Sequence, residues 1–174
     1  MISSNQWNNV LKMMKHRGYE ISLDTPIVSY FSITNCKTVI YCHDQIKLST
    51  QQSKQLISRL TEDKITHIII ITSHPVSRIV QKQFSNFETE LFQLFEFNFC
   101  FIEHDLCPRH KILSKEETDK FLQQHKIEKD NLPRLLAHNP FTRFYGLKTG
   151  IAVIFLREYP NNEPCYFVRI CADS

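Results

Sequence analysis

The fold of this chain is decided by the stretch ITHIIIIT at Ile65–Thr72, in which four isoleucines follow one another. A short, nearly unbroken aliphatic run is typical of a strand buried on both faces, because an alternating pattern would leave one face polar. Such a strand needs helices on both sides of its sheet. The stretch therefore predicts an α/β layer.

The residues around this strand carry the signals of the remaining elements of such a layer. Hydroxyl side chains precede apolar stripes, and glycine or proline stands where helices should end or begin. The expected elements are a helix from Ser3 or Ser4 to Gly18, β-rich segments at Ile27–Ile33 and Thr38–Cys42 with a turn at Asn35, a helix from Ser49 or Thr50 to Leu60, a helix at Val76–Phe84 after Pro75, a helix or strand at Phe87–Phe97, and a strand at Asn98–Ile102. We expect an N-terminal α/β domain at 1–102, a mixed sheet with helices on both faces.

The sequence changes character after residue 103, and we expect a small α+β module at 103–174. A capping box, a proline at a helix start and alternating apolar residues indicate its elements. They are a linker at Asp105–His110, a helix capped by Ser114 with Glu117 at N3 that runs to about His125, a break at Asn131–Pro133, a short helix capped by His138 or Asn139 with Pro140 at N1 that ends at Gly146, and paired strands at Ile151–Arg157 and Cys165–Cys171 with a turn at Asn161–Asn162.

Composition restricts the function classes. The 21 basic and 18 acidic residues give a net charge of +3, which permits a nucleic-acid contact without requiring one. Three glycines are too few for a glycine-rich phosphate loop, which argues against an ordinary nucleotide-binding enzyme. No apolar run approaches the roughly 18 residues of a membrane span, and the start is too polar for a signal peptide. The six cysteines are expected to be free thiols.

Two patterns suggest metal chemistry, and each has a simpler interpretation. Cys100, His104, Cys107 and His110 have a spacing that could suit zinc, but packing of Cys107 as a small apolar residue explains it better. Glu62-Asp63-Lys64 has the letters of a nuclease motif, yet it lies at an expected helix end, and Asp44 with Lys47 has the wrong spacing. No Gly-x-Ser-x-Gly elbow is present. We therefore expect no catalytic residue, no metal and no cofactor.

The last third also carries an ordered series of short signatures. They are EHDL at 103–106 followed by Pro108 and His110, SKEE at 114–117, LPR at 132–134, and NPFTRFYGLKTG at 139–150. This order resembles the shared fifth subunit of eukaryotic nuclear RNA polymerases, whose C-terminal module is the counterpart of a small archaeal polymerase subunit. The resemblance covers Ile102–Ile170, while RGY at 17–19 and IT at 65–66 extend it more thinly to the N-terminal part. It suggests the eukaryotic two-domain form.

The resemblance implies a non-catalytic subunit of a multisubunit DNA-directed RNA polymerase whose active site lies in other subunits. The C-terminal module would dock on the largest subunit and support assembly, with Leu132–Gly150 as its main surface. The N-terminal domain would be a jaw near downstream duplex DNA and would touch phosphates only. The implied partner-binding residues are Arg134, Pro140, Arg143, Tyr145, Gly146 and Lys148, and the implied DNA-proximal residues are His74, Ser77, Arg78 and Lys82.

The residues leave alternatives open beside that implication. RFYGLK at 143–148 interleaves cations with aromatic rings, so it could be a nucleic-acid patch, although tyrosine and arginine also favour a protein interface. The segment Asp24–Leu48 is shorter than the family usually has, and SHPVSR at 73–78 replaces its usual DNA-proximal turn. A compact, divergent copy of this kind resembles those of large DNA viruses or reduced eukaryotic genomes, so the site of action would be the nucleus or a cytoplasmic viral factory or virion. A metal-dependent nuclease and a free-standing transcription factor are the alternative functions.

Overall fold

The computed structural model describes residues 2–19, 30–32, 38–43, 47–159 and 162–173. Its contacts divide the chain into two compact units, Met1–Cys100 and Phe101–Ser174. We call them the N-terminal and the C-terminal unit and describe each by itself. The domain limits expected at 1–102 and 103–174 remain a prediction.

The N-terminal unit is built on one mixed four-stranded sheet. Its strands are β1 (Tyr30–Ser32), β2 (Thr38–His43), β3 (His67–Thr72) and β4 (Glu88–Gln93), in the order β1-β2-β3-β4. β1 runs antiparallel to β2, whereas β2, β3 and β4 are mutually parallel. The aliphatic run is thus a central strand, as predicted. The turn expected at Asn35 lies outside the described residues.

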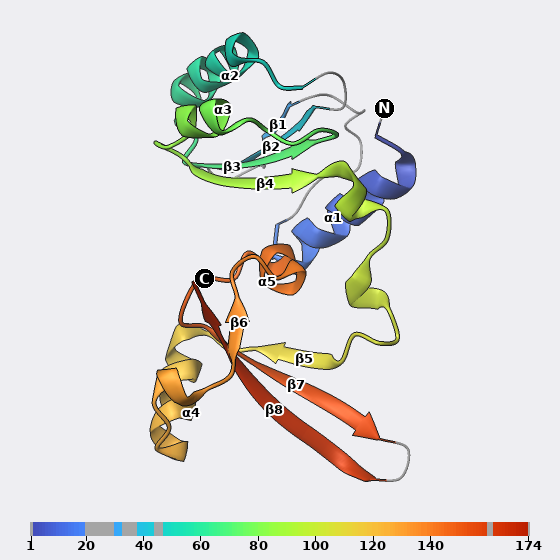
Figure 1. The fold of residues 1–174 in the computed structure, drawn as a ribbon, viewed down its shortest axis with the longest axis vertical. Helices are drawn as coiled ribbons and strands as arrows, with labels where there is room; N and C mark the ends of the chain where they lie inside the picture. Colours follow the sequence, from blue (N-terminus) through green and yellow to red (C-terminus); the bar gives the residue numbers. More distant parts are fainter. Residues whose placement is uncertain (1, 20–29, 33–37, 44–46, 160–161, 174) are drawn as a thin grey trace. The chain divides into compact units, whose positions relative to one another are not determined.

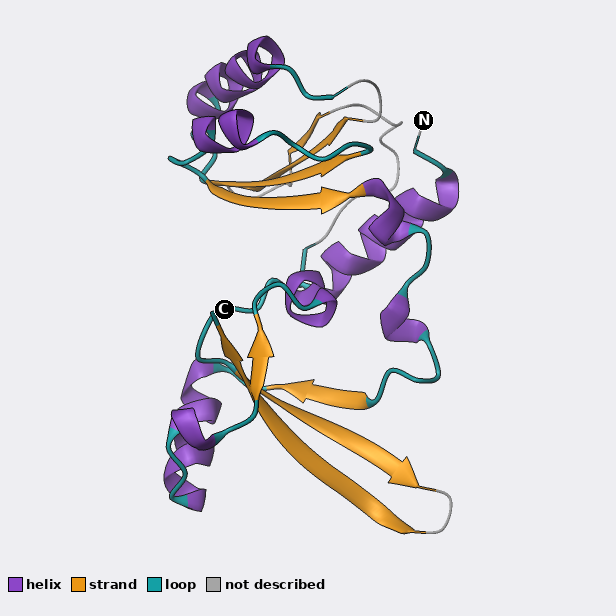
Figure 2. Cartoon of the chain, viewed as in Figure 1, coloured by secondary structure: helices purple, strands orange, loops and turns teal. Residues whose placement is uncertain are grey.

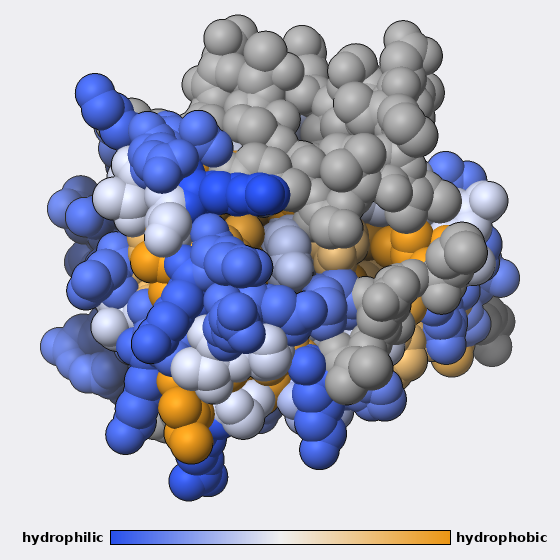
Figure 3. Space-filling model, turned by 90° about the horizontal axis from the view of Figure 1, so that it is seen from above, coloured by the Kyte–Doolittle hydropathy of each residue, from blue (hydrophilic) through white to orange (hydrophobic). Residues whose placement is uncertain are grey.

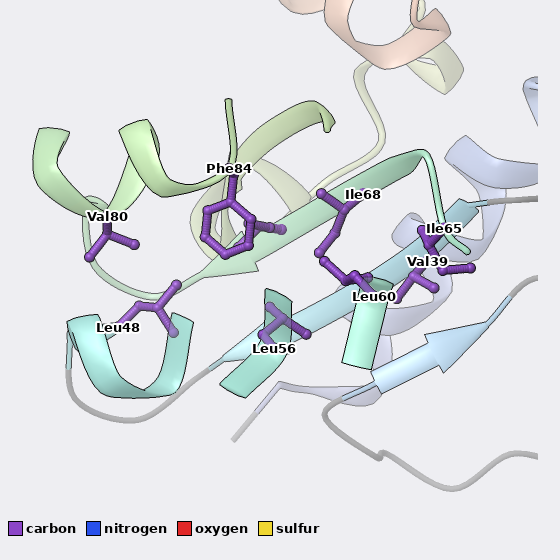
Figure 4. Close-up of a cluster of buried hydrophobic side chains, with 9 residues drawn as sticks. Val39, Leu48, Leu56, Leu60, Ile65, Ile68, Val80 and Phe84 are labelled. Atoms are coloured by element: carbon purple, nitrogen blue, oxygen red, sulfur yellow. The ribbon is translucent and has the colours of Figure 1, made fainter. Parts of the chain in front are cut away.

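Helices cover both faces of this sheet, as the sequence indicates (Figure 1). The helices are α1 (Ser4–His16), α2 (Thr50–Glu62) and α3 (Arg78–Gln83). α2 and α3 lie over one face, where Ile68 and Ile70 pack with Leu56, Leu60 and Phe84 (Figure 4). Ile69 and Ile71 lie on the other face, because successive strand residues alternate, and they are equally buried. Four consecutive isoleucines are therefore all core residues.

The outer surface of this layer is polar where the helices meet water. Seen from above, the face over α2 and α3 is mostly hydrophilic (Figure 3). No helix within the described residues is long and apolar enough to cross a membrane.

Helix starts in this unit follow local hydrogen bonding. Ser3 caps α1 and Ser49 caps α2, each in a complete capping box with a glutamine at N3. The helix expected at Val76–Phe84 begins later, at Arg78, so that prediction was wrong in its start. The reason is that the Ser77 hydroxyl accepts from the Val80 amide, which makes Ser77 the N-cap and leaves the residues before it outside the helix.

An ion-pair network joins α1 to the sheet. The Arg17 guanidinium donates to both carboxylate oxygens of Glu90 on β4, each at 2.7 Å. His67 on β3 donates from Nε2 to Glu90 Oε1 at 2.9 Å, and its Nδ1 lies 3.2 Å from the Thr38 hydroxyl on β2. Burial by itself would raise the pKa of Glu90, but the hydrogen bonds and charges of His67 and Arg17 lower it to about 2. Glu90 therefore stays ionised and holds α1 against two strands.

The strand expected at Asn98–Ile102 is not formed, and that prediction was wrong. The 3-10 turn η1 (Leu94–Phe97) is followed by irregular chain and by η2 (Phe101–Glu103). Side chains of α1 bind the carbonyl groups that a strand would offer to a neighbour: Asn9 donates to the Phe97 carbonyl at 2.8 Å and Asn5 to the Asn98 carbonyl at 3.1 Å. These bonds satisfy the backbone without a sheet.

The C-terminal unit is a four-stranded sheet with two helices (Figure 2). The strands are β5 (Arg109–Ile112), β6 (Arg134–Leu136), β7 (Ala152–Tyr159) and β8 (Asn162–Ala172), in the order β5-β7-β8-β6, and the helices are α4 (Lys115–His125) and α5 (Pro140–Tyr145), with a 3-10 turn η3 (Lys129–Asn131). The long β7–β8 hairpin projects beyond β5 and β6 (Figure 1). The predicted paired strands and both helices are confirmed, whereas β5 begins inside the expected linker Asp105–His110. The turn at Asn161–Asn162 is only partly within the described residues.

The capping box of α4 gives a first testable consequence. Ser114 Oγ accepts from the Glu117 amide at 3.1 Å, and Glu117 Oε2 accepts from the Ser114 amide at 2.8 Å. We expect Ser114→Ala to lower the free energy of unfolding of the C-terminal unit by about 1 kcal/mol, because one orphan amide of the first helical turn loses its partner. Amide hydrogen exchange in α4 measures this loss. The exposed Ser58, replaced by alanine, should change stability by less than about 0.5 kcal/mol, and equal effects of both variants would contradict the role of the cap.

Candidate functional site

The helix α5 is the centre of the candidate site in the C-terminal unit. Asn139 caps it by accepting from the Phe141 amide at 2.9 Å, Pro140 occupies N1, and Gly146 ends it in the left-handed conformation with φ +60°. These are the cap, entry and end that the sequence predicts. Phe141 and Phe144 are buried, so α5 holds one apolar face on the sheet and turns the other outward.

A hydrogen-bond chain fixes the outer face of α5. The Pro108 carbonyl can only accept, so the Nδ1–H of His110 donates to it at 3.0 Å. In the neutral imidazole, Nε2 then accepts from the Tyr145 hydroxyl at 2.7 Å. The His110 ring also meets the Phe141 ring edge-on, with centroids 4.7 Å apart. Tyr145 is therefore held in one orientation by β5 and by the helix itself.

This chain of bonds can be tested by deleting one hydroxyl. Tyr145→Phe should destabilise the C-terminal unit by about 1 kcal/mol, because His110 Nε2 loses its partner while packing is kept. Hydrogen exchange of the β5 and β7 amides reports the change. Tyr166, which is 67% exposed on β8, supplies the matched Tyr→Phe control and should show almost none. If Tyr145→Phe left hydrogen exchange unchanged, the bond between Tyr145 and His110 would contribute nothing to the stability of the C-terminal unit.

Four of the six expected partner-binding residues lie in α5 and its C-cap, and the other two lie in neighbouring segments of the same unit. Pro140, Arg143, Tyr145 and Gly146 belong to the helix and its cap. Arg134 begins β6, and Lys148 lies in the turn after the helix. The four residues Arg134, Pro140, Gly146 and Lys148 are exposed, whereas Arg143 and Tyr145 are half-buried.

The four expected DNA-proximal residues gather in the N-terminal unit. Ser77, Arg78 and Lys82 belong to α3 and its cap, and His74 lies in the turn that follows β3. The side chain of Thr72 fixes that turn by donating to the His74 carbonyl at 2.7 Å. All four residues are exposed. They form a small group with two permanent cations at the carboxyl end of the central strand.

The side chains proposed as zinc ligands do not form a ligand set among the described residues. Among the described residues, no group of three or more histidine, cysteine or carboxylate side chains is placed to hold a metal ion. His110 uses both ring nitrogens in the bonds above, and His104 Nδ1 accepts from the Leu106 amide at 3.1 Å. Of the nuclease candidates, Glu62 ends α2 and is exposed with its two neighbours, while Asp44 lies outside the described residues.

A pocket of about 520 Å³ in the C-terminal unit was not predicted. Its lining is Phe101, His104, Leu106, Cys107, Pro108, Leu135, Asn139, Pro140, Phe141, Phe155, Arg157, Phe167 and Arg169. The two strands were predicted, but the phenylalanine and arginine side chains on one of their faces were not identified as a pocket lining. The signal was present in the period of two, which puts Phe155 and Arg157 of β7 on the same face as Phe167 and Arg169 of β8.

The described residues thus form a two-unit α/β protein whose singled-out surface residues gather around α5 in one unit and α3 in the other. Comparison with known proteins identifies it further. The family model RNA polymerase Rpb5, C-terminal domain, matches residues 99–171, which is nearly the whole C-terminal unit.

Individual relatives cover more of the chain. DNA-directed RNA polymerases I, II, and III subunit rpabc1 of Dictyostelium discoideum is 26% identical over 185 residues, with 93% of each chain covered. DNA-directed RNA polymerase subunit Rpo5 of Pyrococcus horikoshii is 33% identical over 79 residues, 45% of this chain and 94% of the relative. DNA-directed RNA polymerases IV and V subunit 5B of Arabidopsis thaliana is 28% identical over 115 residues, and the match spans about half (53%) of that relative. The chain belongs to the Rpb5 family of RNA polymerase subunits.

Proposed function

We propose that this protein is a non-catalytic subunit of a multisubunit DNA-directed RNA polymerase. The observation that carries the proposal is the family match across residues 99–171, in which the sheet and α5 of the C-terminal unit are complete. Relatives that are similar to this chain are themselves named as polymerase subunits. The active site of the enzyme would lie in other subunits, and this chain would contribute a docking surface and a surface near DNA.

The C-terminal unit would dock on the largest polymerase subunit and support assembly. The outer face of α5 suits that role, since Tyr145 is held rigidly by His110 and so loses little freedom on binding. Arg143, two positions earlier in α5, is half-buried, and tyrosine and arginine are common anchors of protein interfaces. Arg134 and Lys148 would add exposed positive charge at the rim. A nucleic-acid patch is less well supported, because the Tyr145 hydroxyl is hydrogen-bonded to His110 and part of its ring packs on Phe141 within the unit.

The N-terminal unit would act as a jaw close to downstream duplex DNA. Arg78 and Lys82 offer two cations on one short helix, and Ser77 and His74 stand beside them. Contacts to phosphates would suit an enzyme that must pass every sequence, since phosphate contacts carry no base information. The protein would work in the nucleus or, if a virus encodes it, in a cytoplasmic factory or virion.

Affinity purification of the tagged chain from its native source tests the proposal, with mass spectrometry of the partners. Wild type should bring down the two largest polymerase subunits. A double variant, Arg143→Glu with Tyr145→Ala, should deplete them about tenfold, the factor that 1.4 kcal/mol of binding free energy carries. The control Lys120→Glu changes the same charge on exposed α4 and should bring them down like wild type.

Two alternative functions predict other results. A free-standing transcription factor would purify without stoichiometric large subunits. A metal-dependent nuclease would cleave DNA with Mg²⁺ and lose that activity on Glu62→Ala or Asp44→Ala, whereas a purely structural component would have no such activity to lose.

A further inference from the structure

The pocket of the C-terminal unit has an aromatic floor that two strands build together. Phe155 of β7 and Phe167 of β8 are direct cross-strand partners, and their rings stack with centroids 5.3 Å apart and planes 14° apart. Phe141 of α5 closes one end, its ring 5.2 Å from that of Phe155. The volume of about 520 Å³ lies within the range of roughly 300–1,000 Å³ typical of binding pockets. The floor is therefore fixed before any ligand arrives.

The charge at this floor has one sign. The lining contains two arginines, Arg157 and Arg169, and no aspartate or glutamate. The Arg157 guanidinium lies over the Phe167 ring, 5.0 Å from its centroid, and Arg169 Nη1 reaches the Arg134 carbonyl at 3.5 Å. Neither guanidinium has a carboxylate within ion-pair distance among the described residues. Each arginine is thus held at the floor while its positive charge has no local partner.

The wall of the pocket exposes apolar surface. Leu106, which lines it, is 86% exposed, although leucine is usually buried. Exposed apolar side chains next to a preformed pocket mark a contact surface.

We infer that this pocket binds an acidic, apolar-anchored peptide segment of a polymerase subunit: one aromatic or branched aliphatic side chain on the phenylalanine floor, with nearby Asp or Glu residues paired separately to Arg157 and to Arg169. Arginine suits this role because its fork of donors matches a carboxylate. The identity of the partner rests on the proposed function, whereas the chemistry of the ligand rests on the pocket alone. A nucleic-acid strand fits less well, since it needs cations along its whole path and the lining gives two.

The first experiment is selection of a random peptide display library on the immobilised full chain. Enriched peptides should place Asp or Glu within two positions of an aromatic or branched aliphatic residue. Fluorescent peptides that tile the two largest polymerase subunits of the source organism should include a binder with the same pattern. Its affinity should fall with added salt, because the pairing is partly electrostatic.

Charge reversal decides whether the arginines bind the peptide. Arg157→Glu and Arg169→Glu should each weaken binding by about tenfold or more, equivalent to about 1.4 kcal/mol, while Lys120→Glu should leave it within about twofold. Both arginines are exposed, so the variants should keep the circular dichroism spectrum of wild type. A peptide whose acids are changed to lysine should prefer Arg157→Glu over wild type.

Several outcomes would overturn the inference. Enriched peptides without acids, or unchanged affinity in both arginine variants, would do so. So would a fluorescent oligothymidine that binds as tightly as the best peptide and is lost on Arg157→Glu, since the pocket would then be a nucleic-acid site. Copurification of polymerase subunits, with no tiled peptide from those subunits bound by the pocket, would overturn the inference alone and leave the proposed function standing. Acidic-apolar library binders without any polymerase copurification would instead sink the proposed function and leave the pocket chemistry standing.

Discussion

Phe141→Ala should lower the free energy of unfolding of the C-terminal unit by about 4 kcal/mol, the largest effect that we expect from one substitution. Phe141 is 6% exposed and its ring meets those of His110, Tyr145 and Phe155 at centroid distances of 4.7, 4.9 and 5.2 Å. Alanine would leave a cavity under α5 that these neighbours fill only in part. The helix that carries the expected docking residues would lose its main apolar anchor.

Hydrogen exchange of the β7 and β8 amides measures this effect, because those strands form the centre of the sheet. Tyr166→Ala removes a comparable ring from an exposed position of β8 and serves as the control, with an expected change below about 0.5 kcal/mol. If Phe141→Ala cost no more than Tyr166→Ala, α5 would not be packed as described, and the placement of the docking residues would be in doubt.

Glu90→Gln should destabilise the N-terminal unit by about 3 kcal/mol at pH 7, because it removes the negative charge that faces the buried Arg17 guanidinium. The side chain of Arg17 is 5% exposed, and both of its bonds to Glu90 are 2.7 Å long. A glutamine can accept only one of them and places a donor against the guanidinium. The anchor of α1 on β4 would be lost.

The ionisation of Glu90 also makes the stability of the N-terminal unit depend on pH. The pKa of Glu90 is lowered from 4.5 to about 2, so between these values the unfolded chain binds a proton that the folded chain does not. The contribution of Glu90 is therefore complete above about pH 4.5 and is lost as the pH falls toward 2. Glu90→Gln should lack this part of the acid dependence.

Trp7 makes both measurements simple, because it is the one tryptophan of the chain and lies on α1. Its fluorescence should follow unfolding of the N-terminal unit in urea at a series of pH values. Glu88→Gln, an exposed carboxylate on the same strand, is the control and should stay near wild type. An acid dependence in Glu90→Gln equal to that of wild type would show that another group carries it.

The sequence predicted those elements whose local signals agree with their packing. The isoleucine run became a central strand because its own apolar residues demand burial on both faces, and helices cover both faces of the sheet (Figure 1). The capping boxes at Ser3, Ser49 and Ser114 and the Asn139-Pro140 entry fixed helix starts within a residue, since each cap is a local hydrogen bond.

Errors arose where tertiary contacts override local preference. The apolar letters of Asn98–Ile102 suggested a strand, but the side chains of Asn5 and Asn9 take up the carbonyl bonds there. Conversely, β5 reads as a polar linker and is a strand only because β7 lies beside it. Pairing partners of this kind cannot be read from one segment alone.

The site was predicted unevenly for the same reason. Residues of α5 could be identified because they lie in one continuous motif, whose cap, proline entry and glycine end are local signals. The pocket could not, because its floor combines β7, β8 and α5 with the chain before β5, and its arginines carry no motif. The roles of the singled-out residues in partner binding and near DNA remain predictions.

The central claim is that this chain is a constitutive polymerase subunit. The most direct test is to fractionate a native extract by size, assay promoter-independent transcription in each fraction, and quantify this chain and the largest polymerase subunit by mass spectrometry with labelled peptides. We expect the chain to peak with the activity at one copy per largest subunit. A chain found mainly in low-mass fractions, or far below that ratio in the active ones, would contradict the claim.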